Sequence, residues 1–409
     1  MDHELRVRLA GEAHTRPTVP ISPPAMVLHE ARFHDDGGEA SRAFAETLAV
    51  AQGLGPLNPD VDHLLLETAD GSWKWERHGE FSTWTFVRSG HFDPSAALQA
   101  PQFLTDAPGH RFVAAAVFVT ADVPNDEELD RVFGRENAEN ERVGSMLSGR
   151  RAGVWTNFRV GADGWTRFLF ALPDMNQFRA GRAMRRLLEI EVYRMAALFA
   201  LPMAKKAQRE INTLERLVGS AIANADKPES EILDALIDAA REAERIAQHT
   251  AFRFGAAAAY RRIVDQRLRE FREERIEGLQ RISAFLDRRF APAMDTCTST
   301  QTRLETLAKR VERAASLMRT RVDLAMATQN QLQLKSMNEN AKAQLRLQRA
   351  VEGFSVAAIA YYAFSLASAL VAPLSRTFGS AGEAVLKALL VLIIVPAVWA
   401  VLKRLREKL

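Results

Sequence analysis

Two apolar runs near the C-terminal end constrain this chain most strongly. Residues 353–372 have no charged side chain, and a helix of that length rises about 30 Å, close to the thickness of a bilayer's hydrocarbon core. Residues 385–402 contain Lys387 as their only charge, and Trp399 lies where an interfacial aromatic residue is expected. The runs predict a two-helix transmembrane hairpin within residues 353–409. Two buried helices of a soluble protein are the alternative.

Basic residues flank the predicted hairpin, whereas its connector is nearly uncharged. The connector, residues 373–384, holds only Arg376 and Glu383. Because basic flanks stay on the cytoplasmic side of a membrane, we expect both termini in the cytoplasm and the connector outside. This topology predicts a multi-pass protein of the bacterial inner (plasma) membrane, with a basic C-terminal tail. The flanking basic residues are Lys342, Arg346, Arg349, Lys403, Arg404, Arg406 and Lys408.

The remainder of the chain has the composition of a folded protein in water. Of 409 residues, 26% are charged and 47% hydrophobic, which allows more than one domain. The chain opens on a polar sequence, so we expect the N-terminal part to stay in the cytoplasm. Cys297 is the only cysteine, and a cysteine zinc site is not expected. The formal net charge of +3 does not favour nucleic acid as a partner; the lipid bilayer suits the basic residues near the membrane better.

Residues 1–176 predict an N-terminal cytoplasmic domain of α/β or α+β class. The prolines before residue 55 indicate an extended arm that leads into one helix, at about residues 39–52, and a second helix is expected at 126–147. Residues 157–170 predict a β-hairpin. Short β-branched or aromatic runs predict the strands: "HLLLET", "SWKWERH", "STWTFVR", "RFVAAAVFVT", "GVWTNFRV" and "TRFLFAL".

Helices are expected from there to the C-terminus. Residues 177–292 predict long antiparallel helices, and residues 293–352 predict a coiled-coil-like stalk helix that continues into the first membrane run without a breaker. From about residue 298 to 372 this helix would be about 110 Å long. Its apolar seam recurs at steps of three and four, which favours association of several copies. The seam is Leu304, Leu307, Val311, Ala315, Met318, Val322, Ala325 and Leu332.

The seam of this helix becomes polar close to the predicted membrane segment. Amides and hydroxyls that face the axis of a helical ring would line a wet pore, so we expect pore-lining roles for Gln333, Asn340, Gln344, Ser365 and Ser368. The alternative is that the amides set the register of an oligomer or face solvent.

Several stretches are similar to a bacterial family of uncharacterised membrane-anchored proteins, a domain of unknown function. They span nearly the whole chain, but the resemblance implies no catalytic or binding residues. The stretches are "EAHTRP", "KWERHGEFSTWTF", "AGRAMRRLLEIEVYRMAALFALP", "FLDRRFAPAMDTC" and "LRLQRAVEGFSVAAIAYY".

The layout also resembles, more distantly, that of the CorA-type divalent-cation transporters. Those have a cytoplasmic α/β domain, antiparallel helices, a stalk helix that enters the membrane, a second membrane helix and a basic tail. The resemblance implies a homo-oligomer, most simply a pentamer around one pore, with inorganic ions as possible partners. One departure is serious: the Gly-Met-Asn motif of that family is replaced by "APLSRTFGSAG", which puts Arg376 at the expected pore mouth.

Motifs for enzyme chemistry are absent from the sequence. There is no metal-binding His or Cys spacing, phosphate loop, nucleophile elbow or nucleotide fingerprint, so we expect neither an enzyme nor a cofactor or metal. His29, His34, Asp35 and Asp36 form the nearest approach to a metal cluster, although an exposed polar turn explains them better. Five titratable residues suggest a cytoplasmic ligand pocket, and ion pairs that fix the arm to the domain are the alternative. The residues concerned are Glu12, His14, Arg16, Glu76 and Glu80.

The leading functional expectation is an oligomeric inner-membrane ion channel or transporter of CorA-like layout, with an unidentified substrate. The alternative is a membrane-anchored sensor or scaffold that conducts nothing. A continuous axial opening lined by polar side chains would favour the first, and a sealed axis the second.

Overall fold

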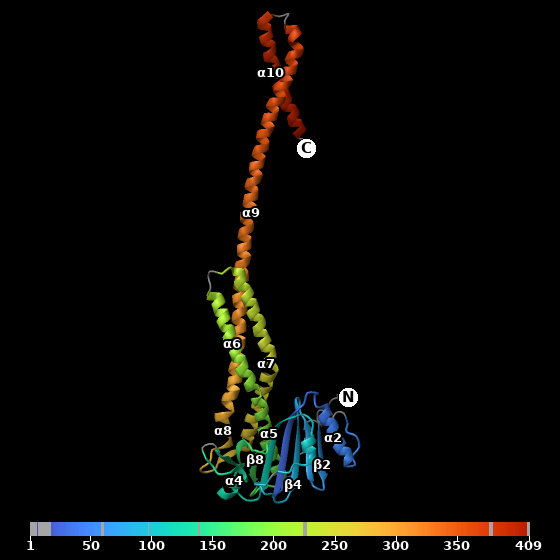
Figure 1. Cartoon of the computed structure of the whole chain (residues 1–409), viewed down its shortest axis with the longest axis vertical. Coiled ribbons are helices and arrows are strands. Elements are labelled where there is room, and N and C mark those ends of the chain that lie inside the picture. Colours follow the sequence, from blue (N-terminus) through green and yellow to red (C-terminus); the bar gives the residue numbers. More distant parts are fainter. Residues whose placement is uncertain are drawn as a thin grey trace. The chain divides into compact units, whose positions relative to one another are not determined.

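The computed structural model describes residues 6, 18–58, 61–96, 98–137, 140–223, 227–375 and 379–406. The chain divides into two compact units, Met1–Ala315 and Ser316–Leu409. The first unit contains a mixed β-sheet and a bundle of helices, and the second contains the later part of one long helix and the apolar helix that follows it (Figure 1).

The sheet has nine strands within the described residues. Neighbouring strands are antiparallel except β5 and β8, which run parallel. In sheet order the strands are β2 (His63–Thr68), β3 (Gly71–Arg77), β4 (Phe81–Ser89), β1 (Ala25–Phe33), β5 (His110–Thr120), β8 (Thr166–Ala171), β7 (Ala152–Val160), β6 (Val143–Leu147) and β9 (Glu273–Arg275).

The strand runs predicted from the sequence are confirmed as β2, β3, β4, β5, β7 and β8, and the predicted hairpin is formed by β7 and β8. Helix α2 (Glu39–Ala51) also matches its prediction. Three expectations were wrong. Strand β1 replaces part of the extended arm, β6 replaces the second half of the helix expected at 126–147, and β9 interrupts the region of long helices expected over residues 177–292.

Local backbone geometry explains two of these differences. Helix α4 (Asp126–Phe133) starts with a capping box between Asn125 and Glu128, and Gly134, with φ of 77°, ends it before β6. Helix α7 (Glu229–Phe271) ends at Arg272, which adopts the left-handed conformation with φ of 50°. The chain then turns back and adds β9 to the edge of the sheet beside β6.

The two faces of the sheet carry two separate cores. One face packs against α2, α3 (Gln102–Asp106) and α4, and its core contains Trp73, Trp75, Trp84 and Trp155. The other face packs against α5 (Gln177–Leu198), with apolar contributions from the helices that follow α5. Helices on both faces leave little of the central strands in contact with solvent.

In the described part of the chain, α5 is followed by α6 (Ala200–Ala223), α7, α8 (Ile282–Arg289), α9 (Ala291–Ser375) and α10 (Gly379–Arg406). Helices α6 and α7 run antiparallel (Figure 1). Ion pairs join the helices: Arg186 of α5 lies 2.8 Å from Glu270 of α7, and Arg261 of α7 lies 2.6 Å from Asp295 of α9. These contacts hold the helices together, and the expectation of long helices after the sheet is confirmed.

The predicted apolar seam of α9 changes its environment along the helix. Leu304, Leu307 and Val311 are at most 4% exposed, so they pack inside the first unit instead of against other copies. Beyond Ala315 the helix is largely exposed, including Leu324 and Leu334. The expectation that one seam serves self-association along its whole length is therefore wrong for its first part.

The second unit exposes many of its large apolar side chains. Helix α9 continues to Ser375, and α10 spans Gly379–Arg406 with Pro396 inside it. Both helices contain a stretch long and apolar enough to cross a membrane, and Ala384–Val401 of α10 has a mean hydropathy of 2.6. These two stretches are consistent with membrane association, since neither is buried inside the protein.

Candidate functional site

The register of three strands gathers polar side chains on one face of the sheet. His29 of β1 pairs with Thr85 of β4, and Thr85 pairs with Lys74 of β3. Two residues further along β3, and so on the same face, Glu76 lies opposite Thr83 of β4. Because strand side chains alternate between the two faces, these five residues share the face that packs against α5. The intervening tryptophans of β3 point to the opposite core.

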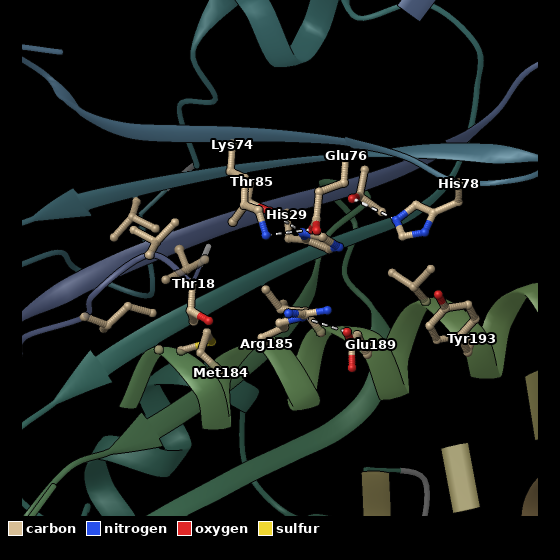
Figure 2. Close-up of a pocket in the computed structure, with 18 of the residues that line it drawn as sticks. Thr18, His29, Lys74, Glu76, His78, Thr85, Met184, Arg185, Glu189 and Tyr193 are labelled. Atoms are coloured by element: carbon tan, nitrogen blue, oxygen red, sulfur yellow. Dashed lines mark hydrogen bonds and ion pairs between the residues drawn. The ribbon is translucent and has the colours of Figure 1, made fainter. Parts of the chain in front are cut away.

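Helix α5 presents a second row of side chains to this polar group. Arg185, Glu189 and Tyr193 follow one another at steps of four residues, which places them on one side of the helix. Figure 2 shows the labelled residues of the sheet and those of the helix facing each other across a gap. Polar groups from strands and helix therefore converge at one place beneath the sheet.

The space between these rows is a pocket whose empty volume, including the solvent at its open side, is about 590 Å³. Apolar side chains make up the rest of its wall, so the polar groups form a band within an apolar cavity. This combination is typical of small-molecule sites. The lining residues with apolar or aromatic side chains are Val19, Ile21, Val27, Phe81, Val87, Met184, Leu188, Val192 and Tyr193.

A glycine allows the chain before β1 to close one end of the pocket. A Cβ atom on Gly181 of α5 would lie only 2.2 Å from the carbonyl oxygen of Val19. The amide of Ile21 donates a hydrogen bond of 3.1 Å to the carbonyl of Gln177 in the same helix. Thr18 and Val19 are thus held against α5, where both line the pocket.

Lys74 and Glu76 form a buried ion pair on the sheet side of the pocket. The Lys74 Nζ and Glu76 Oε2 atoms lie 2.9 Å apart, and the side chains are 6% and 14% exposed. Burial lowers the pKa of Lys74, an effect that the neighbouring carboxylate opposes. Burial alone would raise the pKa of Glu76, but the Lys74 ammonium outweighs it and the pKa lies below its ordinary value. Glu76 is therefore a carboxylate at neutral pH.

His29 is one of the most deeply buried polar residues of the pocket. Its Nδ1 atom lies 2.8 Å from Thr85 Oγ1, whereas its Nε2 atom has no hydrogen-bond partner among the described residues. Burial lowers the pKa of His29 to about 3. The ring is therefore neutral at physiological pH, with one nitrogen as a donor and the other as an acceptor.

A network of charges supports the helix side of the pocket. Glu189 Oε1 lies 2.8 Å from Arg185 Nε, and the other Glu189 oxygen accepts a hydrogen bond from Arg267 of α7. Arg267 also pairs with Glu270, 3.1 Å away. These contacts hold Arg185 and Glu189 in place, because each belongs to a chain of partners that extends to the next helix.

Two polar atoms of the pocket lack partners within the described chain: His29 Nε2 and Glu76 Oε1. Buried polar atoms are almost always hydrogen-bonded, because leaving one unpartnered costs about 1–3 kcal/mol. No three His, Cys, Asp or Glu side chains among the described residues are arranged to hold a metal ion. The arrangement is suited to binding a small molecule that hydrogen-bonds to both atoms.

The structure does not bring together the described members of the weak pocket predicted from sequence. Glu76 lines the pocket, but Glu80 lies in the turn after β3 and pairs with α7. Its Oε2 atom is 2.8 Å from Arg253 Nη2, and its other oxygen accepts a hydrogen bond from Tyr260. The remaining three, Glu12, His14 and Arg16, lie outside the described residues.

The suspected metal cluster is also dispersed. His29 faces the pocket, whereas Asp36 accepts hydrogen bonds from the amides of Gly38 and Ala40 at the start of α2. Asp35 is highly exposed and lies 3.5 Å from His110.

The predicted pore-lining residues lie on the second unit's part of α9. Gln333, Asn340, Gln344 and Ser365 are exposed, and Ser368 is half-buried with its hydroxyl donating to the carbonyl of Phe364. A pocket between α9 and α10 includes Ser368 among its lining residues. Arg376 lies outside the described residues.

Sequence reasoning missed most of the pocket. Lys74, Thr83, Thr85, Arg185 and Glu189 were not singled out, although "WKWE" and "STWTF" alternate polar and aromatic residues. Such alternation identifies a polar face on each strand, and the covering helix decides whether that face meets water or a cavity.

Comparisons with known proteins place the chain in a family. No curated protein and no solved structure matches it, so the resemblance to CorA-type transporters is not shown. The family model described as "Protein of unknown function (DUF3422)" matches residues 1–409. The expected membership of an uncharacterised family is confirmed: the chain belongs to the DUF3422 family over its whole length.

Proposed function

We propose that this protein is a membrane-anchored sensor or scaffold whose sheet domain binds a small polar molecule. The pocket between β1, β3, β4 and α5 is the binding site. Helices α9 and α10 form a transmembrane hairpin, with both termini in the cytoplasm of a bacterial cell. The exposed part of α9 joins copies of the chain into a homo-oligomer.

One observation carries the binding role. His29 Nε2 and Glu76 Oε1 are buried polar atoms without a partner in the described chain, and both belong to residues that line the same cavity. A ligand that bonded to both would recover the energy lost by burying them. The ion pairs of Lys74 and Arg185 hold the polar walls of the cavity in place before anything binds.

The membrane anchor and the oligomer are supported by exposure and charge. Leu366 and Leu370 of α9 and Leu392 of α10 are more than two-thirds exposed, which is costly in water but favourable in lipid. Basic residues flank both apolar stretches, and this favours cytoplasmic termini. Leu324 and Leu334 of α9 lie outside the apolar stretch and offer surface to another copy.

A thermal-shift screen of the full chain in detergent micelles tests the binding role. We expect at least one class of small polar compounds to raise the melting temperature in a concentration-dependent way. The variant Leu188→Phe places a larger side chain in the pocket wall and should abolish that shift. If no compound gives a shift that depends on Leu188, the sheet domain is not a small-molecule sensor.

Ion conduction by a CorA-like oligomer is the second candidate. Gln333, Asn340 and Gln344 favour it, because these exposed amides would face water if copies of α9 surrounded an axis. Flux of several cations and anions from loaded liposomes tests this candidate. Flux that falls when Asn340→Leu is introduced would support conduction, whereas no flux above that of empty liposomes would support the non-conducting sensor.

A further inference from the structure

We propose that the pocket beneath the sheet recognises a neutral primary carboxamide carried on an apolar body. The inference rests on the proposed binding role and names the chemical class of the ligand. It follows from the hydrogen-bonding needs of Glu76 and His29, the charge balance of the pocket and the apolar wall around them.

The carboxylate of Glu76 requires a hydrogen-bond donor. Its Oε2 atom is taken by Lys74 Nζ at 2.9 Å, whereas Oε1 is buried without a partner among the described residues. An ionised carboxylate only accepts hydrogen bonds. A ligand group that reaches Oε1 must therefore carry an N–H or O–H.

The imidazole of His29 requires a group that can adapt to either tautomer. If Nδ1 donates to Thr85 Oγ1, then Nε2 is an acceptor and needs a donor from the ligand. If the Thr85 hydroxyl donates to Nδ1, then Nε2–H is a donor and needs an acceptor. A carboxamide satisfies both cases, because it has two N–H bonds and a carbonyl oxygen.

The charges that line the pocket are balanced. Lys74 is paired with Glu76, and Arg185 is paired with Glu189. A ligand with a net charge would leave one uncompensated charge in a buried site, which is unfavourable. This balance favours a neutral group over an ammonium or a carboxylate.

The other ligand classes meet specific obstacles. A carboxylate has no hydrogen atom to offer Glu76 Oε1. An ammonium adds a net positive charge to the balanced pocket, and in the tautomer that carries Nε2–H it offers His29 no acceptor. An alcohol has one hydrogen atom, so in the tautomer whose Nε2 is an acceptor it cannot donate to Glu76 and to His29 at the same time.

The apolar wall defines the rest of the ligand. Val27, Phe81, Leu188, Val192 and Tyr193 surround the polar band, and the rings of Phe81 and Tyr193 lie 5.9 Å apart in an edge-to-face arrangement. A ring or a branched alkyl group would pack against these side chains.

Four matched probes test the assignment on the full chain in detergent micelles: 3-phenylpropanamide, 3-phenylpropanoate, 3-phenylpropylamine and 3-phenylpropanol. Isothermal titration calorimetry gives a Kd for each. We expect the amide to bind at least about tenfold more tightly than the other three, since each of those loses a hydrogen bond to a buried partner or adds a charge. Tighter binding of the acid, the amine or the alcohol would overturn the proposal.

Two conservative variants test whether the amide probe binds in this pocket. Glu76→Gln should weaken amide binding by about tenfold or more, because it removes the ionised acceptor. Glu80→Gln is the matched control, since Glu80 lies in the adjacent turn and pairs with α7 outside the pocket. It should change the Kd less than about twofold. Equal losses for both variants would contradict binding at this site, and the wild-type probe series decides the ligand class even if a variant fails to fold.

The outcomes separate this inference from the proposed function. Binding that Leu188→Phe abolishes, but that is strongest for the acid or the amine, retains the sensor and overturns the carboxamide. Absence of Leu188-dependent binding for all four probes and throughout the wider screen overturns both.

Discussion

The two units of this protein differ in which side chains they bury and which they expose. The sheet domain buries charged residues such as Lys74 and Glu191, which are 5% and 2% exposed, whereas the second unit leaves Phe354 78% exposed. Buried charge costs free energy unless it is paired, and exposed apolar surface costs free energy unless something covers it. In the first unit ion pairs offset this cost, because Lys74 pairs with Glu76 and Glu191 pairs with Arg194. In the second unit the exposed apolar surface is consistent with membrane association.

Removing a tryptophan side chain should distinguish the two regions most strongly, by its effect on the free energy of unfolding. Trp84 is fully buried in the core between the sheet and α2, whereas Trp399 of α10 is 57% exposed. We expect Trp84→Ala to lower the free energy of unfolding of the sheet domain by about 3–5 kcal/mol, and Trp399→Ala to change it by less than about 0.5 kcal/mol. Urea unfolding followed by near-UV circular dichroism measures both. Equal effects would mean that the two regions share one core.

A charge in α10 tests whether its exposed apolar surface faces lipid. Ile393 lies near the middle of the apolar stretch and is 63% exposed. Ile393→Arg should raise the free energy of membrane insertion by about 3–4 kcal/mol, and the control Ile393→Val should leave it nearly unchanged. The inserted fraction of α10 in a translocon insertion assay is the measurement. Full insertion of the arginine variant would count against a membrane-spanning α10.

Two glycines of the helical region compare a tightly packed position with an open one. A methyl group on Gly181 would collide with the Val19 carbonyl, whereas nothing lies within 4 Å of the corresponding position on Gly219. We expect Gly181→Ala to destabilise the protein by about 1–3 kcal/mol, and Gly219→Ala to stabilise it by about 0.5–1 kcal/mol through helix propensity. Thermal melts of the two variants should shift in opposite directions. A neutral Gly181→Ala would show that residues 18–19 are not fixed against α5.

The buried histidine predicts a specific pH dependence. Burial lowers the folded-state pKa of His29 from its ordinary value of 6.5 to about 3, so between these values the unfolded chain binds a proton that the folded chain does not. Stability that is present above about pH 6.5 is therefore lost as the pH falls toward 3, by up to about 1.4 kcal/mol per pH unit. His29→Gln should remove this part of the slope in urea unfolding between pH 7 and 4.

His110→Gln serves as the matched control for that experiment, because its side chain is 81% exposed. We expect it to follow the wild-type pH dependence. If the unfolding free energy of His29→Gln depended on pH as the wild type does, the imidazole of His29 would be in contact with water instead of buried.

The sequence predicts those elements whose pattern is local. The strands β2 to β5 and the helix α9 were found because alternation and three–four spacing repeat over adjacent residues. Strand β1 was missed because prolines precede it and because its partners, β4 and β5, lie far along the chain. Strand β9 has three residues, too few for any period, and only its pairing with β6 makes it a strand.

The pocket was partly visible for the same reason. Glu76 was noticed for its charge, and its neighbours could be placed on one face of β3 by alternation. Neither observation shows that α5 covers that face, since the placement of residues 74 and 185 around one pocket depends on tertiary packing. Alternation also indicates which tryptophans point away from the pocket. It does not indicate that His29, Thr85 and Lys74 lie side by side on three neighbouring strands.

The position of β9 has a consequence for synthesis of the chain. Until residues 273–275 leave the ribosome, β6 has an open backbone edge on one side. At usual translation rates this interval lasts on the order of ten seconds, long enough for an unpaired edge to meet another nascent chain. The finished edge is only three residues long, so the hazard is largely confined to the period before release and decreases once helix α7 has formed and turned back.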